Sequence, residues 1–518
     1  MLPYISRRLL FMIPTLIGMT LMVYTLIALA PGGFSASASA AAGGGSPAGG
    51  DPRIAEAKFR DRFLLDEPLL TQYGRWLVRV IPLKFGARAQ IDATGERIYP
   101  PALLPDMIAL SDASGAGLLM VLNDAAANAR SAFTAAPEGE ARQAQYRQAA
   151  RDAKATREAF VGALAHLRIT LAEYATATDQ GSLVDHRGEL PGESCSDLRV
   201  ERTHPRWAVV EAATSAAIDA CVRATGARAT LEAAFESRPF SEAGVPIIPG
   251  VLSVGAPDLG WSRTKNRPVA SLIAEALPLT LLINVVAFPL IYLISIPTGM
   301  VAAARRGSLF DVITGGLFIA LWSIPVVWAG VLAVGFLASN QYLGLFPVAG
   351  LHSTDSSFMT FLPSYATSGE GGFQRGWLLD LLWHLVLPVT CLVYAGFAVL
   401  SRQTRAAMLD NFNADYVRTA KAKGVPRRDI VLRHVFRNSL LPLITMFVSI
   451  FPAMLSGSVV VEKIFSVPGM GSLMLEAISL HDAEIMLANT VMIGCVSLLA
   501  LLLADILYAI ADPRVSYA

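Results

Sequence analysis

Six long apolar stretches leave this chain few choices of fold. They cover residues 9–30, 277–304, 312–339, 379–400, 440–461 and 485–510. At a rise of about 1.5 Å per helical residue, the first stretch alone is about 33 Å long, enough to cross the hydrocarbon core of a bilayer. Hydrophobic residues make up 53% of the 518 residues and charged residues only 16%, which excludes an ordinary soluble domain of this size. The sequence predicts an all-α integral membrane protein with six transmembrane helices.

The N-terminal stretch, in a segment placed at 1–31, has two interpretations. Arg7 and Arg8 precede it, and residues 28–30 resemble a cleavage site, so a cleaved signal peptide is the alternative to a membrane anchor. The apolar run is longer than the core of a usual signal peptide, and Pro31 would make cleavage there unfavourable. We therefore expect an uncleaved first transmembrane helix.

Basic residues are unevenly distributed between the short loops that join these stretches. One set of loops holds Arg7, Arg8, Arg305, Arg306 and Arg514, together with Arg402, Arg405, Arg418, Lys421, Lys423, Arg427, Arg428, Arg433 and Arg437. The opposite short loops hold only Arg375 and Lys463. Because short loops rich in Lys and Arg stay in the cytoplasm, we expect both termini and the loop at 402–438 to be cytoplasmic, and residues 32–275 to be extracytoplasmic.

A long hydrophilic region separates the first two stretches. Residues 32–85 are interpreted as a Gly-, Ala- and Ser-rich linker followed by a short amphipathic helix, and residues 86–255 as a helical insertion. Two apolar stripes in the insertion repeat at steps of three and four: Phe160, Leu164, Leu167, Leu171 and Tyr174, then Trp207, Val210, Thr214, Ala217 and Cys221. This spacing predicts an antiparallel helical hairpin or small bundle, a packed core with no site in it.

Two of the four cysteines, Cys195 and Cys221, lie in this insertion. Outside the cytoplasm they could form a disulfide, which we favour over the alternative of two unpaired thiols. The chain has no CxxC motif and no cluster of cysteine and histidine, so we expect no structural metal site.

The chain lacks the motifs of an enzyme. It has no phosphate-binding loop and no nucleophile or metal motif, so we expect no catalytic residues and no cofactor of its own. Asp505 is the clearest ionisable residue inside an apolar stretch, where Tyr508 or Arg514 could satisfy it. An ion- or proton-driven carrier usually needs more buried charge, so the energy for transport should come from a partner. The net charge of +1 gives no indication of nucleic-acid binding.

Three large side chains within the stretches are candidates for lining a transport path. Trp322, Trp328 and Met454 would suit a large and varied substrate. The alternative is that they face lipid or pack against other helices.

The loop that follows the fourth stretch contains a basic helix, a sharp break and a second helix. Gly424 lies where a helix ends in a residue with positive φ, and Pro426 lies where the next helix tolerates a missing N–H. The first helix, from Asp415, is too short to be stable alone in water, so it must pack against the protein or a partner. Contact with anionic lipid would explain the basic charges but not the break.

This loop resembles the cytoplasmic loop of the permease subunits of dipeptide and oligopeptide ABC importers. The likeness is carried by Tyr416-Val417-Arg418-Thr419-Ala420-Lys421-Ala422-Lys423-Gly424 and by Arg433-His434-Val435-Phe436-Arg437-Asn438. Further matches follow in the order typical of the family at 7–10, 13–15, 30–32, 267–269, 277–281, 296–299, 306–308, 346–347, 384–388, 465–471 and 512–514. Together they cover residues 1–85 and 256–518.

The resemblance implies a type I importer in a bacterial inner membrane. A second homologous permease would complete the path for peptides or peptide-like solutes, two ATPase subunits or domains would bind ATP and Mg, and an extracytoplasmic binding protein would deliver the solute. Residues 256–518 would form the core permease domain with five spans. The coupling loop at 402–438 would contact the ATPase through 415–438, with these residues: Tyr416, Arg418, Thr419, Ala420, Gly424, Arg433, His434 and Asn438.

Two features depart from the wider importer pattern. Arg418-Thr419-Ala420 stands where many importers have Glu-Ala-Ala, as in the peptide branch, so a contact specific to glutamate cannot be transferred. The insertion at 86–255 divides a segment that is continuous in the family. It implies contact with the binding protein or with the second permease, and the alternative is a domain that only fills space.

Two other functions remain as alternatives for the whole chain. One is an ion- or proton-coupled carrier that depends on Asp505. The other is a membrane-anchored scaffold that presents the extracytoplasmic helical domain.

Overall fold

The chain forms two compact units in the computed structural model. The structure describes residues 2–30, 51–85, 90–92, 97–106, 112–185, 187–242, 244–248, 251–365 and 373–511. One unit consists of Met1–Ile27 with Leu259–Ala518, and the other consists of Ala28–Asp258. Much of the expected linker at 32–85, namely 32–50, lies outside the described residues, as does Arg514. We refer to the two units as the membrane unit and the insertion unit.

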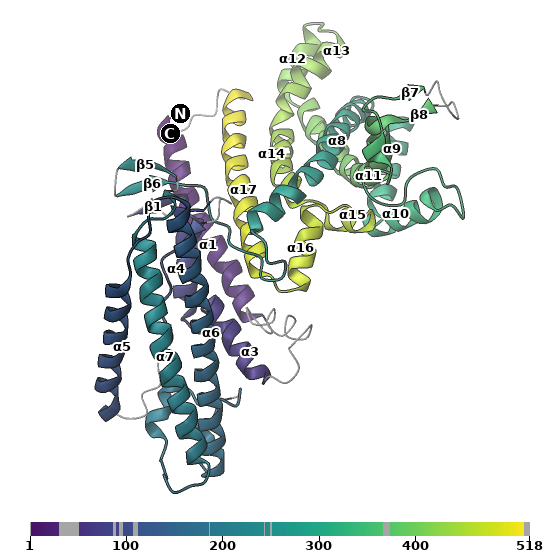
Figure 1. The fold of residues 1–518 in the computed structure, drawn as a ribbon. Coiled ribbons are helices and arrows are strands. Elements are labelled where there is room, and N and C mark those ends of the chain that lie inside the picture. Colours follow the sequence, from purple (N-terminus) through teal and green to yellow (C-terminus); the bar gives the residue numbers. More distant parts are fainter. Residues whose placement is uncertain are drawn as a thin grey trace. The chain divides into compact units, whose positions relative to one another are not determined.

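The membrane unit is built from helices that differ greatly in length (Figure 1). They are α1 (Leu2–Leu29), α8 (Val269–Ala304), α9 (Leu309–Trp322), α10 (Val326–Leu332), α11 (Gly376–Phe412), α12 (Asp415–Ala422), α13 (Arg427–Asp429), α14 (Leu440–Ser456), α15 (Val459–Ile464), α16 (Met470–Ser479) and α17 (Ala483–Ala511). Two π-helical segments, Ala333–Ala338 and Ile430–Phe436, continue α10 and α13.

Five of these segments are long and apolar enough to cross a membrane. They are Ile5–Leu29, Val269–Ala304, Gly376–Phe412, Leu440–Ile464 and Ala483–Tyr508. The span expected at 312–339 is broken in the structure, where Leu309–Trp322 and Val326–Ala338 meet at an angle of 87°. Pro325 caps the second of these helices, and a proline disfavours helical geometry in the residue before it. The bent pair counts as a sixth span only if its two arms are taken together.

The centre of the membrane unit lies where α8 and α11 pack along each other. A methyl group at Gly299 would lie only 2.6 Å from the carbonyl oxygen of Ser401, so only glycine allows this approach. Next to it, the hydroxyls of Thr298 and Ser401 are 3.0 Å apart. Small residues and hydroxyl pairs are how helices associate closely in membranes, where burial of apolar area gives little driving force.

The insertion unit is mainly a helical bundle, as the two apolar stripes predict. Its helices are α3 (Pro52–Phe63), α4 (Leu69–Val80), α5 (Asp112–Ala132), α6 (Glu140–Ala177) and α7 (Trp207–Glu236). α6 and α7 pack on each other, α5 adds to α7, and α3 adds to α6. Phe160, Leu167 and Tyr174 from one stripe and Ala217 from the other are fully buried in a shared core. The helical hairpin is confirmed.

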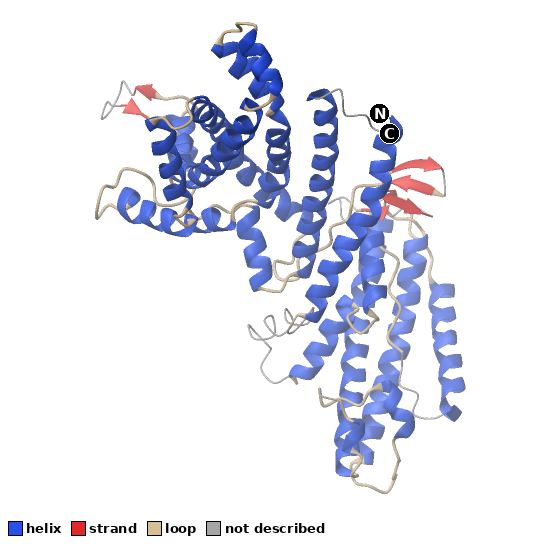
Figure 2. Cartoon of the chain, turned by 180° about the vertical axis from the view of Figure 1, so that it is seen from behind, coloured by secondary structure: helices blue, strands red, loops and turns tan. Residues whose placement is uncertain are grey.

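Short strands correct the expectation that the fold is all-α (Figure 2). β1 (Leu83–Phe85), β6 (Leu252–Val254) and β5 (Val245–Ile248) form one antiparallel sheet; β3 (Arg97–Ile98), β2 (Gln90–Ile91) and β4 (Ser241–Glu242) form a second; β7 (Ser364–Tyr365) and β8 (Phe373–Gln374) form a hairpin. β1 and β6 pair Leu83 with Val254 at the entry and exit of the insertion. The chain enters and leaves antiparallel there, so the two strands satisfy each other's backbone groups.

The disulfide between Cys195 and Cys221 is not formed in this structure. Both cysteines are buried, with free thiols, in the same apolar core. The Cys195 thiol instead lies 3.4 Å from the carbonyl oxygen of Pro191. Burial raises the pKa of both thiols, because it disfavours the charged thiolate. They behave as small apolar side chains of the helical core.

Candidate functional site

The loop after α11 has the expected break between two helical segments. α11 ends at Phe412, α12 runs from Asp415 to Ala422, and Gly424 has a φ of +72°. Pro426 then caps α13, which is only three residues long and continues as a π-helix rather than as the regular second helix that we expected. Because α11 continues to Phe412, the expected loop at 402–438 begins later than predicted, and from here on the term coupling loop means residues 415–438.

The short helix α12 is held by packing on the membrane unit. Val417 and Ala420 lie on one face, since residues three apart point the same way along a helix, and both are buried. They join a cluster that includes Met408 of α11, Ala303 of α8 and Ile430. The helix therefore contacts the ends of two long helices at once, which explains how eight residues can form a stable helix.

Polar contacts of Tyr416, of Arg427 and of Ser439, which directly follows the loop, hold the coupling loop in place. The hydroxyl of Tyr416 donates to Asn411 Oδ1 at 2.7 Å, and the amide of Asn411 in turn donates to Ser439 Oγ at 3.1 Å. Ser439 Oγ also donates to the carbonyl of Ala407. On the other side, the guanidinium of Arg427 donates to the carbonyl of Ala304 at 2.5 Å. The loop is thereby bound to both α11 and α8.

The outer surface of the coupling loop is basic. The side chain of Arg418 is 76% exposed and that of Arg433 is 78% exposed, each with one carboxylate of the same loop nearby. Lys421 and Lys423 are exposed as well. Because the apolar face of α12 is buried and its charged face is not, this surface is available to a macromolecule with acidic groups.

The remaining residues expected in the site differ in exposure. Thr419 is exposed, and its hydroxyl donates to the carbonyl of Asp415. Ala420 is buried, so its place is in the packing beneath α12. His434 is half-buried, and its carbonyl accepts a hydrogen bond from the exposed Asn438.

The structure does not bring together the three residues expected to line a transport path. Trp322 ends α9 and Trp328 lies in α10, on the two arms of the bend, and they are 61% and 62% exposed. Met454 lies in α14, where its carbonyl accepts a hydrogen bond from Asn284 of α8 at 3.4 Å. No contact among the described residues unites the three side chains, so their role in a path stays a prediction.

A partly buried ion pair, which the sequence did not reveal, connects α9 to α11. The guanidinium of Arg405 donates to both carboxylate oxygens of Asp311, at 2.6 and 2.9 Å. Asp311 is buried and also accepts from the backbone N–H of Gly307. A bidentate pair with this geometry holds two helices in one register. An aspartate at the start of an apolar stretch is the signal that could have identified it.

Three other buried carboxylates lie at the loops and helix ends of the membrane unit. Asp380 accepts from the backbone N–H and the hydroxyl of Ser353, and Asp482 accepts from the hydroxyls of Ser262 and Thr264. The third is Glu462. All three are less than 3% exposed, and each one binds a segment far away in the sequence. They are structural connections between loops and helices.

Glu462 lies in a cradle made of glycines. Its carboxylate accepts from the hydroxyl of Thr280 at 2.9 Å and from the backbone N–H of Ser472 at 2.9 Å. A methyl group at Gly457 would lie 2.4 Å from Glu462 Oε1, and one at Gly469 would lie 2.6 Å from Oε2. The absence of a side chain at Gly457 and Gly469 thus leaves room for the buried carboxylate of Glu462.

Asp505 forms an ion pair that the sequence did not suggest, whereas Arg514, one of the two suggested partners, lies outside the described residues. The carboxylate of Asp505 pairs with Arg8 of α1 at 3.1 Å, whereas the hydroxyl of Tyr508 lies against that of Thr445. The pair joins the first helix to the last. This structural role weakens the alternative of a carrier that depends on Asp505.

The sequence is similar to those of known membrane proteins, and these similarities identify its family. Residues 295–517 match the family described as binding-protein-dependent transport system inner membrane component. A 262-residue stretch, 50% of this chain, is 40% identical to the oligopeptide transport system permease protein AppB of Bacillus subtilis (strain 168) and covers 76% of it. Over 265 residues, also 50% of this chain, the identity to the dipeptide transport system permease protein DppB of Escherichia coli (strain K12) is 32%, with 77% of that protein covered.

A third relative agrees with these two. The chain is 35% identical to the inner membrane ABC transporter permease protein YejB of Escherichia coli O157:H7 over 261 residues, which are 50% of this chain and 68% of that protein. Permeases of this kind are multi-pass and non-catalytic, in agreement with the long apolar helices. This chain belongs to the family of inner membrane permease components of binding-protein-dependent ABC transport systems.

Proposed function

We propose that this chain is one of two permease subunits of an ATP-driven importer of peptides, and that its coupling loop docks on an ATPase subunit. The observation that carries the proposal is the two-sided character of α12. Its apolar face is buried against α8 and α11, and its basic face is exposed. Peptides are proposed as the solute because two relatives are named as oligopeptide and dipeptide permeases.

The packing of α12 suggests how energy reaches the membrane helices. Val417 and Ala420 press on a cluster with Met408 and Ala303, near the ends of the two longest spans. A displacement of α12 by closure of an ATPase pair would therefore move α8 and α11 as rigid bodies, since packed interfaces do not deform continuously. In this proposal, the ATPase subunits bind ATP and Mg, and the permease does not. The second permease and an extracytoplasmic binding protein complete the assembly.

Charge reversal on the exposed face of α12 tests the docking. We expect that Lys421→Glu combined with Arg418→Glu reduces recovery of the ATPase subunit with the purified permease by about tenfold or more, because two exposed attractive charges become repulsive. The measurement is the amount of ATPase that co-purifies with the tagged permease. Arg306→Glu, an exposed site on the loop between α8 and α9, is the matched control and should retain the ATPase. Equal recovery with both variants would refute docking on α12.

We also propose that the insertion unit lies outside the cytoplasm, with both termini inside. The asymmetry of Lys and Arg between the short loops supports this orientation. The test uses a variant in which all four native cysteines are replaced by serine. In this background, Arg151→Cys, at an exposed position of α6, should react with a membrane-impermeant maleimide in intact spheroplasts. Lys421→Cys on α12 should react only after permeabilisation. The opposite pattern of labelling would invert the topology.

A further inference from the structure

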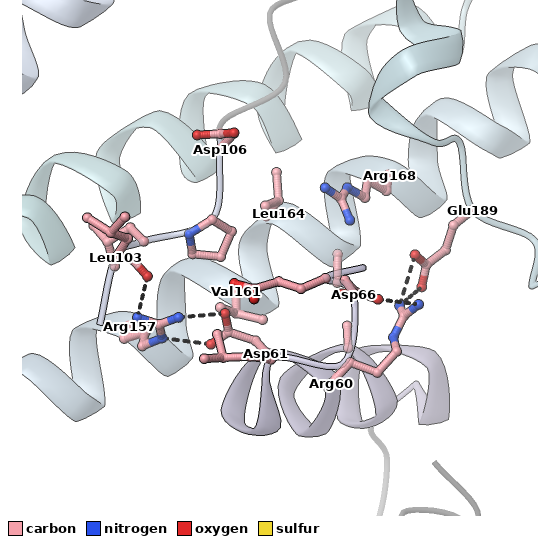
Figure 3. Close-up of a pocket in the computed structure, with 16 residues that line it drawn as sticks. Arg60, Asp61, Asp66, Leu103, Asp106, Arg157, Val161, Leu164, Arg168 and Glu189 are labelled. Atoms are coloured by element: carbon pink, nitrogen blue, oxygen red, sulfur yellow. Dashed lines mark hydrogen bonds and ion pairs between the residues drawn. The ribbon is translucent and has the colours of Figure 1, made fainter. Parts of the chain in front are cut away.

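The insertion unit contains a cavity that the proposed transport function does not use. It has a volume of about 420 Å³ and lies between α3, α6 and the segment around Leu104 (Figure 3). This volume is in the range typical of small-molecule sites. One wall is apolar and includes Leu64, Val161 and Leu164. Charged side chains form the rest of the lining.

Most of these charged groups already satisfy each other. Arg157 donates to both oxygens of Asp61, at 2.7 and 2.8 Å. Arg60 donates to both oxygens of Glu189 at 3.2 Å, and both of these side chains are buried. Figure 3 shows these pairs along the lower edge and right side of the cavity. The pair of Arg157 with Asp61 is bidentate and therefore rigid. In the pair of Arg60 with Glu189, one nitrogen, Nη2, contacts both carboxylate oxygens. The two ion pairs form walls of the cavity.

Arg168 is different, because its guanidinium has no partner among the described residues that line the cavity. Its Nε is buried and forms no hydrogen bond. Figure 3 shows the guanidinium pointing from α6 toward the middle of the cavity. A guanidinium remains charged at any physiological pH, and an unpaired one in a partly buried site is costly. Its planar fork fits a carboxylate in two parallel hydrogen bonds.

Asp106 provides the opposite charge at another edge of the same cavity. In the described part of the chain no hydrogen bond or ion pair engages its carboxylate, and Figure 3 shows it above the apolar wall. Three arginines and five carboxylates line the cavity, so the lining is acidic overall. An acidic lining repels a simple anion, even though Arg168 needs one. A ligand that carries both a negative and a positive charge can pair with Arg168 and Asp106 without adding net negative charge to the cavity.

We propose that this cavity binds a small zwitterion with an apolar side chain, its carboxylate on Arg168 and its ammonium at Asp106. Free apolar amino acids and short apolar peptides share this chemistry. The apolar part of the ligand rests on Leu64, Val161 and Leu164. The inference is independent of the proposed transport function, since it concerns binding to the insertion unit and needs no ATPase.

Calorimetric titration of the full-length protein in nanodiscs, without partner proteins, tests this site. We expect saturable binding of leucine or of leucyl-leucine, and the tighter of the two probes identifies the source of the zwitterion. N-acetyl-leucine, which lacks the ammonium, and leucinamide, which lacks the carboxylate, should each bind about tenfold more weakly or worse than leucine. Failure of leucine and leucyl-leucine to bind at up to about 10 mM would overturn the proposal.

Variants of Arg168 and Asp106, compared with a control on α6, separate the site from general effects on the insertion unit. Arg168→Gln should weaken binding of the tighter probe by about tenfold or more, and Arg168→Lys, which keeps the charge without the fork, should weaken it less. Asp106→Asn should restore part of the affinity for N-acetyl-leucine. Arg151→Gln, an exposed arginine of the same helix outside the cavity, is the control and should bind as the wild type does. Unchanged binding by both Arg168 variants would exclude the site.

Discussion

Replacing Gly424 by valine is expected to stop ATP-driven uptake while the protein stays folded. Gly424 has a φ of +72°, and a Cβ atom there would have nothing within 4 Å. The substitution therefore causes no clash, and its whole effect is backbone strain. A β-branched residue in this conformation costs about 1–2 kcal/mol or more, which the chain can avoid by turning α12 relative to α13.

Such a turn would separate α12 from the cluster of Met408 and Ala303. We expect uptake of a labelled peptide into proteoliposomes with the complete transporter to fall about tenfold or more, and ATP hydrolysis to continue, since a small strain energy is enough to change the populated conformation. Gly424→Asn is the control, because asparagine tolerates positive φ, and it should retain most of the uptake. If valine and asparagine behave alike, backbone conformation at this position does not matter for coupling.

Local patterns in the sequence predicted those parts of the fold that depend on neighbours in the chain. The stripe from Phe160 to Tyr174 was sufficient to predict α6 and its buried face, because helical spacing and burial are both local. The break at Gly424 and Pro426 was likewise readable from two residues. For the same reason, the coupling loop was the most predictable part of the site.

Features that depend on distant partners were not accessible in this way. Hydropathy measures the length of an apolar stretch and not its direction. Pro325 indicates a kink or a helix end, but it does not indicate a bend as large as 87°. Glu462 meets Thr280 across 182 positions of sequence, and no local pattern shows that contact. The strands β1 and β6 are short, and each gains its partner only when the insertion between them folds.

Removing the carboxylate of Glu462 is expected to destabilise the membrane unit more than any other single change considered above. Glu462 is 2% exposed, and Glu462→Ala leaves the Thr280 hydroxyl and the Ser472 N–H without their acceptor. Each buried unsatisfied group costs about 1–3 kcal/mol, so a loss of about 2–6 kcal/mol is expected for the two groups. The measurement is the apparent Tm of the purified protein in detergent, which should fall clearly.

Two comparisons decide whether the buried carboxylate or the crowding around it is responsible. Glu476→Gln is the matched control, because this carboxylate of α16 is about half exposed, pairs with Lys265 at 2.7 Å and should contribute less than about 1 kcal/mol. Gly469→Ala places a methyl group 2.5 Å from Thr280 Oγ1 and must push the carboxylate out of its cradle, so its Tm should fall as well. Because the two substitutions break the same contact, Glu462→Ala with Gly469→Ala should lower the Tm by less than the sum of the single effects. Fully additive losses would show that the glycines serve another purpose than making room for Glu462.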